Sequence, residues 1–207
     1  MSEPAATELE LRGPRIRLRV PREGDAQRLF ELASDEEVTR FFSWGPYQLQ
    51  DEAVAWLATL EARRAAGIAL ELAVVDSDDW LIGITGVFEV SKRDRRCVVG
   101  TWLGQAYWGT GANAESKALV AALAFGRLNM ERLGAWADVR NPRSQRALER
   151  LGFVREGTLR AFHRHGDERR DVVSYSLLRD EWQQSALAGV DVAVIGEVPP
   201  EFTCPER

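Results

Sequence analysis

The chain has 207 residues and a formal net charge of −5, with 45% hydrophobic and 29% charged residues, as expected for one soluble domain with a proper core. Its acidic balance argues against nucleic-acid binding, no apolar run is long enough to span a bilayer, and residues 1–5 lack the features of a signal peptide. Two cysteines make no disulfide framework and neither histidine has a second ligand at metal-binding spacing, so we expect a cytoplasmic protein without a metal site.

The first 33 residues predict an arm, a strand and a helix. Residues 1–13 are expected to form a loose N-terminal arm. Charged and apolar residues alternate over 15–20, which predicts a half-buried strand, and apolar residues recur at helical spacing over 22–33. Ser34 and Glu37 have the spacing of a capping box that opens a second short helix.

An aromatic group follows around a Gly-Pro break, and its members are Phe41, Phe42, Trp44 and Tyr47. Such a group either pins a loop to the core by its rings or forms an aromatic lip over a cleft. The next segment, 51–66, is amphipathic and predicts a helix closed by Gly67.

The middle of the chain changes to the period of strands. Residues 69–75, 80–90 and 95–103 predict three strands joined by short polar turns, which is an antiparallel meander. A largely buried helix over 111–128 and a strand over 133–139 follow.

A short helix and a long hairpin complete the pattern. The helix has Asn141 as a good N-cap, Pro142 at its first position and Gly152 after its last residue. Residues 153–164 and 170–178 predict a hairpin whose exposed edges make a homodimer plausible. An extension after Trp182 suggests no function.

The turn that joins the third meander strand to the helix after it carries the most chemical information. Gly109 and Gly111 can adopt positive φ, and a helix start directs N–H groups and a positive dipole at one spot, where diphosphates bind. Anion binding by residues 110–114 and ordinary loop chemistry are both open interpretations. The segment also fits a G-x-G-x-x-G/A dinucleotide fingerprint, but the acidic residue this requires is misplaced, since Glu131 precedes the next strand and Asp138 comes late in it.

The order of elements, together with three motifs, resembles the GNAT acetyltransferase superfamily and, more narrowly, the RimJ/RimL type of bacterial N-acetyltransferase. The motifs are Trp108-Gly109-Thr110-Gly111, Asn141-Pro142-Arg143-Ser144 and Arg155-Glu156-Gly157. The resemblance implies an α/β fold with a mixed, mostly antiparallel sheet, helices on both faces, and a splay between the strands ending at Leu103 and Val139. It divides the chain into an arm (1–13), an acetyltransferase domain (14–182) and an extension (183–207).

In such proteins acetyl-CoA is the co-substrate, with its pantetheine in the splayed gap and its pyrophosphate on the amides of the glycine turn. The resemblance implies a cofactor-binding set of Trp102, Leu103, Trp108, Gly109, Thr110, Gly111, Ala112, Asn113, Asn141, Ser144 and Arg146. Trp108 departs from the superfamily's usual Gln or Arg. Asn113 replaces its last Gly or Ala, so its side chain either crowds the phosphate or hydrogen-bonds to it. For Asn141 a plain helix cap, and for Ser144 a solvent-facing hydroxyl, are the structural alternatives.

Acetyl transfer to an amine requires a neutral nitrogen, hydrogen bonds to the developing oxyanion and a proton for the departing thiolate. His163 is the candidate base and Glu156 the second choice. The alternative for His163 is an exposed histidine without a catalytic role, and the alternative for Glu156 is a structural carboxylate. Ser144 resembles the family's proton donor, and Tyr175 is a fallback whose alternative is core packing. The expected acceptor mouth comprises Phe41, Trp44 and Tyr47.

We therefore expect an acetyl-CoA-dependent N-acetyltransferase that works through a ternary complex, without a covalent enzyme intermediate. The acceptor is either an N-terminal α-amine of a protein or peptide, or a small amine such as an antibiotic or metabolite; neither a nucleic acid nor a membrane is an expected partner. A catalytically silent acyl-CoA-binding sensor is the alternative, because no residue is an unambiguous base.

Overall fold

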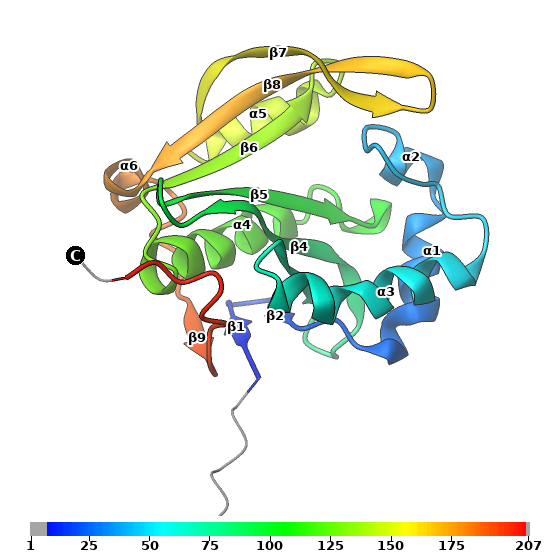
Figure 1. Ribbon diagram of the computed structural model, residues 1–207, viewed down its shortest axis with the longest axis horizontal. Helices are drawn as coiled ribbons and strands as arrows, with labels where there is room; N and C mark the ends of the chain where they lie inside the picture. Colours follow the sequence, from blue (N-terminus) through cyan, green and yellow to red (C-terminus); the bar gives the residue numbers. More distant parts are fainter. Residues whose placement is uncertain (1–7, 206–207) are drawn as a thin grey trace, which may run out of the picture.

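The computed structural model describes residues 8–205, which contain one nine-stranded sheet and the helices that pack on it (Figure 1). The strands are β1 (Glu10–Arg12), β2 (Arg17–Arg19), β3 (Ala69–Val75), β4 (Leu81–Ser91), β5 (Arg96–Leu103), β6 (Arg132–Asp138), β7 (Val154–His165), β8 (Glu168–Leu178) and β9 (Ala193–Ile195). The helices are α1 (Ala26–Ala33), α2 (Glu36–Thr39), α3 (Gln50–Ala65), α4 (Ala112–Ala122), α5 (Pro142–Arg150) and α6 (Arg179–Gln184). Within the described residues no helix is both long enough and apolar enough to cross a membrane.

The sheet has the strand order β7-β8-β6-β5-β4-β3-β2-β1-β9 and separates two apolar layers. Successive side chains of a strand point to opposite faces, so β3 serves both layers. Its Leu70, Leu72 and Val74 belong to the larger cluster with α4, while Ala73 and Val75 belong to the cluster with α1 and α3. This arrangement confirms the expected mixed α/β fold with helices on both faces.

The sheet opens between β5 and β6, which run parallel and diverge along their length (Figure 1). Their pairing is confined to the first residues of each strand, Arg96–Val98 with Arg132–Gly134. Beyond that point β5 continues to Leu103 next to β4, and β6 continues to Asp138 next to β8. The splay expected from the family resemblance is therefore present, and it lies at the carboxyl ends of both strands.

The N-terminal segment is not a loose arm throughout. Residues 10–12 form β1, which pairs with β2 on one side and β9 on the other. Leu11 is fully buried, and its register partners are Leu18 and Val194. The expectation of an arm over 1–13 is wrong for residues 10–12 because burial of Leu11 holds them in the sheet; residues 1–7 lie outside the described part.

Two helix boundaries also differ from the sequence pattern. Asp35, not Ser34, caps α2, because its side chain accepts from the main-chain N–H of Glu37, while the Ser34 hydroxyl donates to the Phe30 oxygen at 2.7 Å. The predicted helix over 111–128 is α-helical only to Ala122. A π-helical turn over Leu123–Arg127 continues it.

Candidate active site

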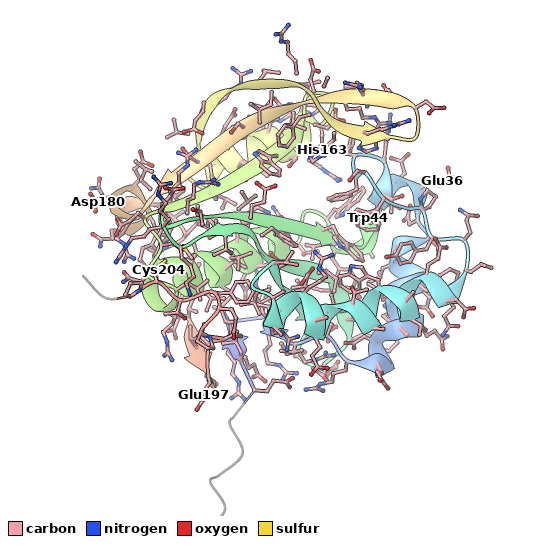
Figure 2. The ribbon with its side chains drawn as sticks, in the orientation of Figure 1. Glu36, Trp44, His163, Asp180, Glu197 and Cys204 are labelled. Atoms are coloured by element: carbon pink, nitrogen blue, oxygen red, sulfur yellow. The ribbon has the colours of Figure 1, made fainter. Side chains whose placement is uncertain are left out.

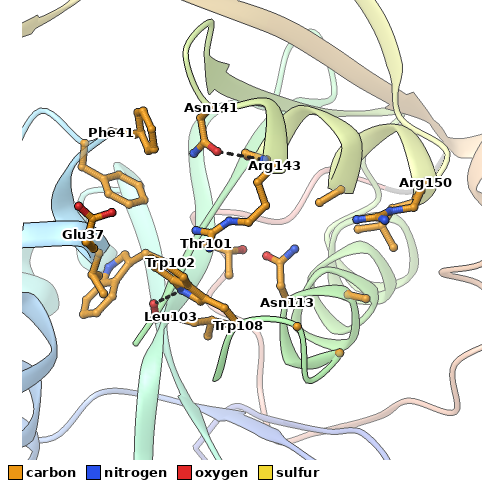
Figure 3. A pocket seen from close by; sticks show the side chains of 18 residues that line it. Glu37, Phe41, Thr101, Trp102, Leu103, Trp108, Asn113, Asn141, Arg143 and Arg150 are labelled. Carbon is orange, nitrogen blue, oxygen red and sulfur yellow. Dashed lines mark hydrogen bonds between the residues drawn. The ribbon is translucent and has the colours of Figure 1, made fainter. Parts of the chain in front are cut away.

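A cavity of about 490 Å³ opens where β5 and β6 diverge (Figure 3). Its walls come from the end of β5, the glycine turn, the first turn of α4, the inner side of α5, and α2 with the residues just after it. The lining residues are Glu37, Val38, Phe41, Phe42, Thr101, Trp102, Leu103, Trp108, Gly109, Gly111, Asn113, Ala114, Asn141, Arg143, Ser144, Ala147, Arg150 and Leu151.

The glycine turn has the backbone conformation that its sequence predicts. Gly109 has φ +78° and Gly111 has φ +94°, a region that favours glycine. A Cβ at Gly109 would meet no other heavy atom within 4 Å, so the main chain there is open to a ligand. Gly111 is the N-cap of α4, and the first N–H groups of a helix have no acceptor within it. The turn therefore offers main-chain donors at one edge of the cavity.

A buried carboxylate braces this turn from behind. Glu115 is 4% exposed and accepts from the main-chain N–H groups of Arg15 at 2.7 Å and Ile16 at 3.0 Å. Its second oxygen accepts from Arg15 Nε at 2.9 Å, and Arg15 Nη1 donates to the Thr110 main-chain oxygen at 2.8 Å. The start of α4 is thereby tied to the chain entering β2. Sequence reasoning missed this brace.

Trp108 connects the turn to the neighbouring strand and to α5. Its indole N–H donates to the main-chain oxygen of Leu103, the last residue of β5, at 2.8 Å. The guanidinium of Arg143 lies 3.6 Å from the Trp108 ring centroid, and Figure 3 shows it reaching across from α5. Partial burial lowers the pKa of Arg143, and the nearby Glu37 carboxylate opposes that shift.

The start of α5 places Asn141 and Ser144 on the cavity wall. Asn141 Oδ1 accepts from the Ser144 main-chain N–H at 3.1 Å, which makes it the cap of this helix. Pro142 holds the first helical position. Arg146 does not line the main cavity but lines a smaller hollow beside it, which also includes Arg143.

Of the expected cofactor-binding set, eight residues line the cavity: Trp102, Leu103, Trp108, Gly109, Gly111, Asn113, Asn141 and Ser144. Thr110 and Ala112 belong to the same turn but are not part of the lining. The Thr110 hydroxyl donates to the Tyr107 oxygen at 2.8 Å, which stabilises the turn internally. The structure therefore brings most of this set together around one space.

Two of the expected catalytic residues are engaged away from the cavity. Glu156 accepts from Arg132 at 2.7 Å and from the Ser176 hydroxyl at 3.0 Å, and the hydrogen bond from Arg132 holds its pKa below the ordinary value. Tyr175 is fully buried, its hydroxyl donates to Glu149 at 3.2 Å, and burial raises its pKa. These contacts agree with a structural role for both residues.

His163 lies on the β7–β8 hairpin and is not part of the cavity lining (Figure 2). Its ring contacts Phe162 and Trp136, with centroids 4.9 and 5.8 Å away. The hairpin reaches the α2 region, because Arg170 Nη1 donates to the main-chain oxygen of Arg40 at 2.8 Å. His163 therefore stands on an aromatic surface outside the cavity.

Only some residues of the aromatic group after α2 line the cavity. Phe41 and Phe42 line the cavity, whereas Trp44 and Tyr47 do not. The Trp44 ring lies 5.2 Å from Phe42 and 5.3 Å from Trp102, measured between centroids. Of the expected acceptor mouth only Phe41 reaches the cavity directly, and Trp44 supports the wall from behind.

Three ionisable side chains of the lining were not assigned to the site from sequence: Glu37, Arg143 and Arg150. Arg143 stands inside the Asn-Pro-Arg-Ser motif, so its position next to Asn141 was a usable signal. Glu37 was interpreted only as a capping partner, and nothing in the sequence pattern singles out Arg150. The cavity thus combines one carboxylate and two guanidinium groups with main-chain donors.

Comparisons with known proteins agree with this geometry. Residues 15–154 match the family described as "Acetyltransferase (GNAT) domain". A relative from Bacillus subtilis (strain 168), the uncharacterized N-acetyltransferase YoaA, is 28% identical over 167 residues, which cover 80% of this chain and 94% of YoaA.

Two solved structures show the same fold. A GCN5-related N-acetyltransferase from Brucella melitensis matches with TM-score 0.78 and 23% identity, over 90% of this chain and 85% of that one. Spermidine N-acetyltransferase from Vibrio cholerae, solved in complex with CoA and spermine, matches with TM-score 0.70 and 21% identity, over 81% of this chain and 97% of that one.

Proposed function

The chain belongs to the GNAT acetyltransferase family, and from that premise we propose that it transfers an acetyl group from acetyl-CoA directly to a primary amine. The observation that carries the proposal is the position of the cavity. It lies beside the end of β5, beyond the point where β5 and β6 part, and is bordered by a glycine turn with main-chain donors and by the start of α5. An extended thioester with an anionic end fits such a site.

The lining residues match the two ends of acetyl-CoA. The open main chain at Gly109 and the N–H groups in the first turn of α4, which have no acceptor within the helix, suit a diphosphate, and Arg143 adds a positive charge nearby. Thr101, Trp102 and Leu103 form the strand wall along which the pantetheine would lie. We assign Asn141 and Ser144 to contacts with the donor from the α5 side, and Arg146 to its phosphates from the smaller hollow.

In the reaction the amine nitrogen forms a bond to the acetyl carbon, the carbon–sulfur bond breaks, and the amine loses one proton while the thiolate gains one. We propose that the Ser144 hydroxyl, which lines the cavity, donates the proton to the thiolate. Tyr175 is a less suitable donor because it is buried and bonded to Glu149.

The need for a neutral nitrogen favours an acceptor that is easily deprotonated. Glu37 is the carboxylate of the lining; it accepts from Arg40 at 3.4 Å and can also attract the cationic amine. An α-amine with a pKa near 8 is about a tenth neutral at pH 7, whereas a lysine with a pKa near 10.4 is neutral in only about 0.04% of molecules. We therefore propose a peptide N-terminal α-amine, or a small amine of similarly low pKa, as the acceptor, in keeping with a RimJ/RimL-type enzyme.

We further propose that residues 14–182 form the catalytic domain and that the extension from residue 183 has a supporting role. The residues that line the cavity all precede residue 152. The extension instead contributes β9, which pairs with β1, and a fully buried Phe202.

Free-thiol release from acetyl-CoA tests the proposal. The panel comprises short peptides with Ser, Ala or Met at the N-terminus, the same peptides with a blocked N-terminus, polyamines and aminoglycosides. Thiol release with one unblocked class and not with its blocked control supports the enzyme and identifies the acceptor. Silence throughout, with acetyl-CoA still raising the melting temperature, would favour an acyl-CoA-binding sensor, and silence without stabilisation would reject acetyl-CoA as the ligand.

A further inference from the structure

A buried lysine lies directly beneath the glycine turn. Lys117, on α4, is 7% exposed, and its Nζ donates to Oδ1 of Asn113 at 2.7 Å. The chain has only one other lysine, Lys92, which is exposed in the turn after β4. Burial lowers the pKa of Lys117 to about 8. A buried ammonium is unfavourable unless it is well paired, so its contact with a cavity residue calls for a functional explanation.

The lysine fixes the orientation of the Asn113 side chain. An ammonium group carries only donors, so the amide atom facing Lys117 must be the carbonyl oxygen. The Nδ2 atom with its two N–H donors is then turned away from Lys117. Asn113 lines the cavity at the first turn of α4, facing α5 across the space (Figure 3). Its free N–H groups are therefore available to a ligand in the cavity.

A purely structural explanation of the pair is weak. Side chains four positions apart on an exposed helix stabilise it by small amounts. Here the cation is buried and its partner is a neutral amide, so the contact does not offset the loss of hydration. An apolar side chain at this buried position of α4 would avoid that penalty.

We propose that Asn113 and Lys117 form a two-residue anion-binding element for the diphosphate of acetyl-CoA. Asn113 Nδ2 donates to a diphosphate oxygen, and Lys117 is a positioning residue that holds the amide in this orientation and adds positive charge behind it. The inference rests on the proposed function. It also decides between the two expected effects of Asn113, which departs from the family's usual Gly or Ala. The side chain forms a hydrogen bond with the phosphate and does not crowd it.

Isothermal titration of CoA into purified variants tests the pair. N113A and K117M each weaken the Kd by about tenfold, as expected for one charge-assisted hydrogen bond. The double variant N113A/K117M is weakened no further than either single variant, because the two residues act as one unit. The matched control K92M binds CoA like the wild type.

N113D separates binding from a structural role. An aspartate at this position pairs with the Lys117 ammonium, so the melting temperature rises or holds, whereas CoA affinity falls by more than tenfold because the donors are replaced by a negative charge. A purely structural pair would leave the CoA affinity of N113A and K117M unchanged, and neither of these variants introduces a negative charge into the cavity. If the wild type binds CoA and both N113D and K117M bind it with unchanged affinity, this inference alone is overturned. If the wild type does not bind CoA, the inference and the proposed function are both overturned.

Discussion

The guanidinium of Arg143 lies 3.6 Å from the Trp108 ring centroid, so a cation from α5 meets an indole from the glycine turn across the cavity. Stacking on an aromatic face keeps an arginine extended and leaves its N–H edge free for an anion. Trp108, in turn, is held by its hydrogen bond to Leu103. The two sides of the splayed sheet are therefore connected at the place where we expect phosphates.

R143M tests the charge at this contact. Methionine keeps an apolar side chain against Trp108 but removes the cation, and we expect the Kd of acetyl-CoA to rise about tenfold, or about 1.4 kcal/mol. Titration calorimetry at low and high salt should show a weaker salt dependence in the variant, since screening acts on charges. The control is R93M, because the Arg93 side chain is 95% exposed and outside the cavity lining. Equal affinities for R143M and R93M would contradict the role.

Substitutions at Asn141 separate helix capping from ligand binding. N141A removes the cap of α5 and should lower the free energy of unfolding by about 1 kcal/mol. N141D preserves a good cap and should unfold like the wild type, yet it replaces an amide by a carboxylate at the cavity and should weaken acetyl-CoA binding by about fivefold or more. Urea unfolding and calorimetry measure both effects. Wild-type affinity in N141D would leave Asn141 as a cap only.

Ser144 and Tyr175 are expected to behave differently when their hydroxyl groups are removed. S144A should lower kcat by about 100-fold if its hydroxyl protonates the thiolate. Y175F loses one hydrogen bond to Glu149, which should cost about 1 kcal/mol of stability while kcat stays within about twofold. Steady-state kinetics with the acceptor found in the thiol-release panel, together with urea unfolding, gives both quantities. The opposite ranking of kcat would assign proton donation to Tyr175.

Removal of the Glu115 charge should loosen the base of the glycine turn. E115Q retains the size of the side chain but replaces one acceptor oxygen with an NH₂ group that faces donors. We expect a loss of about 2–3 kcal/mol in the free energy of unfolding, because three N–H groups converge on this carboxylate. R15M leaves two of those contacts in place and should lose less, since the Arg15 side chain is 60% exposed. Equal losses in both variants would argue against the brace.

The stability difference between wild type and K117M should depend on pH. The folded pKa of Lys117 is about 8, below its ordinary 10.5, so between these values the unfolded chain binds more protons and wild-type stability rises with pH. The Lys117 ammonium therefore lowers the free energy of unfolding of the wild type most below pH 8. We expect the stability that K117M gains over the wild type to be largest below pH 8 and to shrink by about 3 kcal/mol between pH 8 and 10.5. A gain that does not change with pH, measured by urea unfolding, would count against the buried ammonium.

Much of the fold could be predicted from periodicity. β3, β4 and β5 were placed within a few residues because long runs of apolar and β-branched side chains mark them, and α5 was bounded by its cap and its glycine. By contrast β1 was not predicted, although Leu9 and Leu11 alternate with charged residues over 8–12, and β9 has only three residues. Their pairing depends on partners far along the chain, which a local pattern does not encode.

The parts of the site that depend on main-chain conformation or on a local motif could be predicted from the sequence. The parts that depend on contacts between side chains were harder to predict. The turn at Gly109 and Gly111 and the cap at Asn141 follow from local sequence. The engagement of Glu156 by Arg132, and the pairing of Lys117 with Asn113, follow from three-dimensional proximity and burial. The sequence therefore left Glu156 open both as a second choice for the base and as a structural carboxylate, and only the structure shows that Arg132 on β6 binds it.

The pairing of β1 with β9 has a consequence for the order of folding. Leu11 and Val194 are register partners although they are about 180 residues apart in the chain. Closing so long a loop costs conformational entropy before any contact is gained, so this edge of the sheet is expected to assemble after the β3–β4–β5 meander has formed. The same edge then opens first during native-state fluctuations, and amide exchange should be faster at residues 193–195 than in β4.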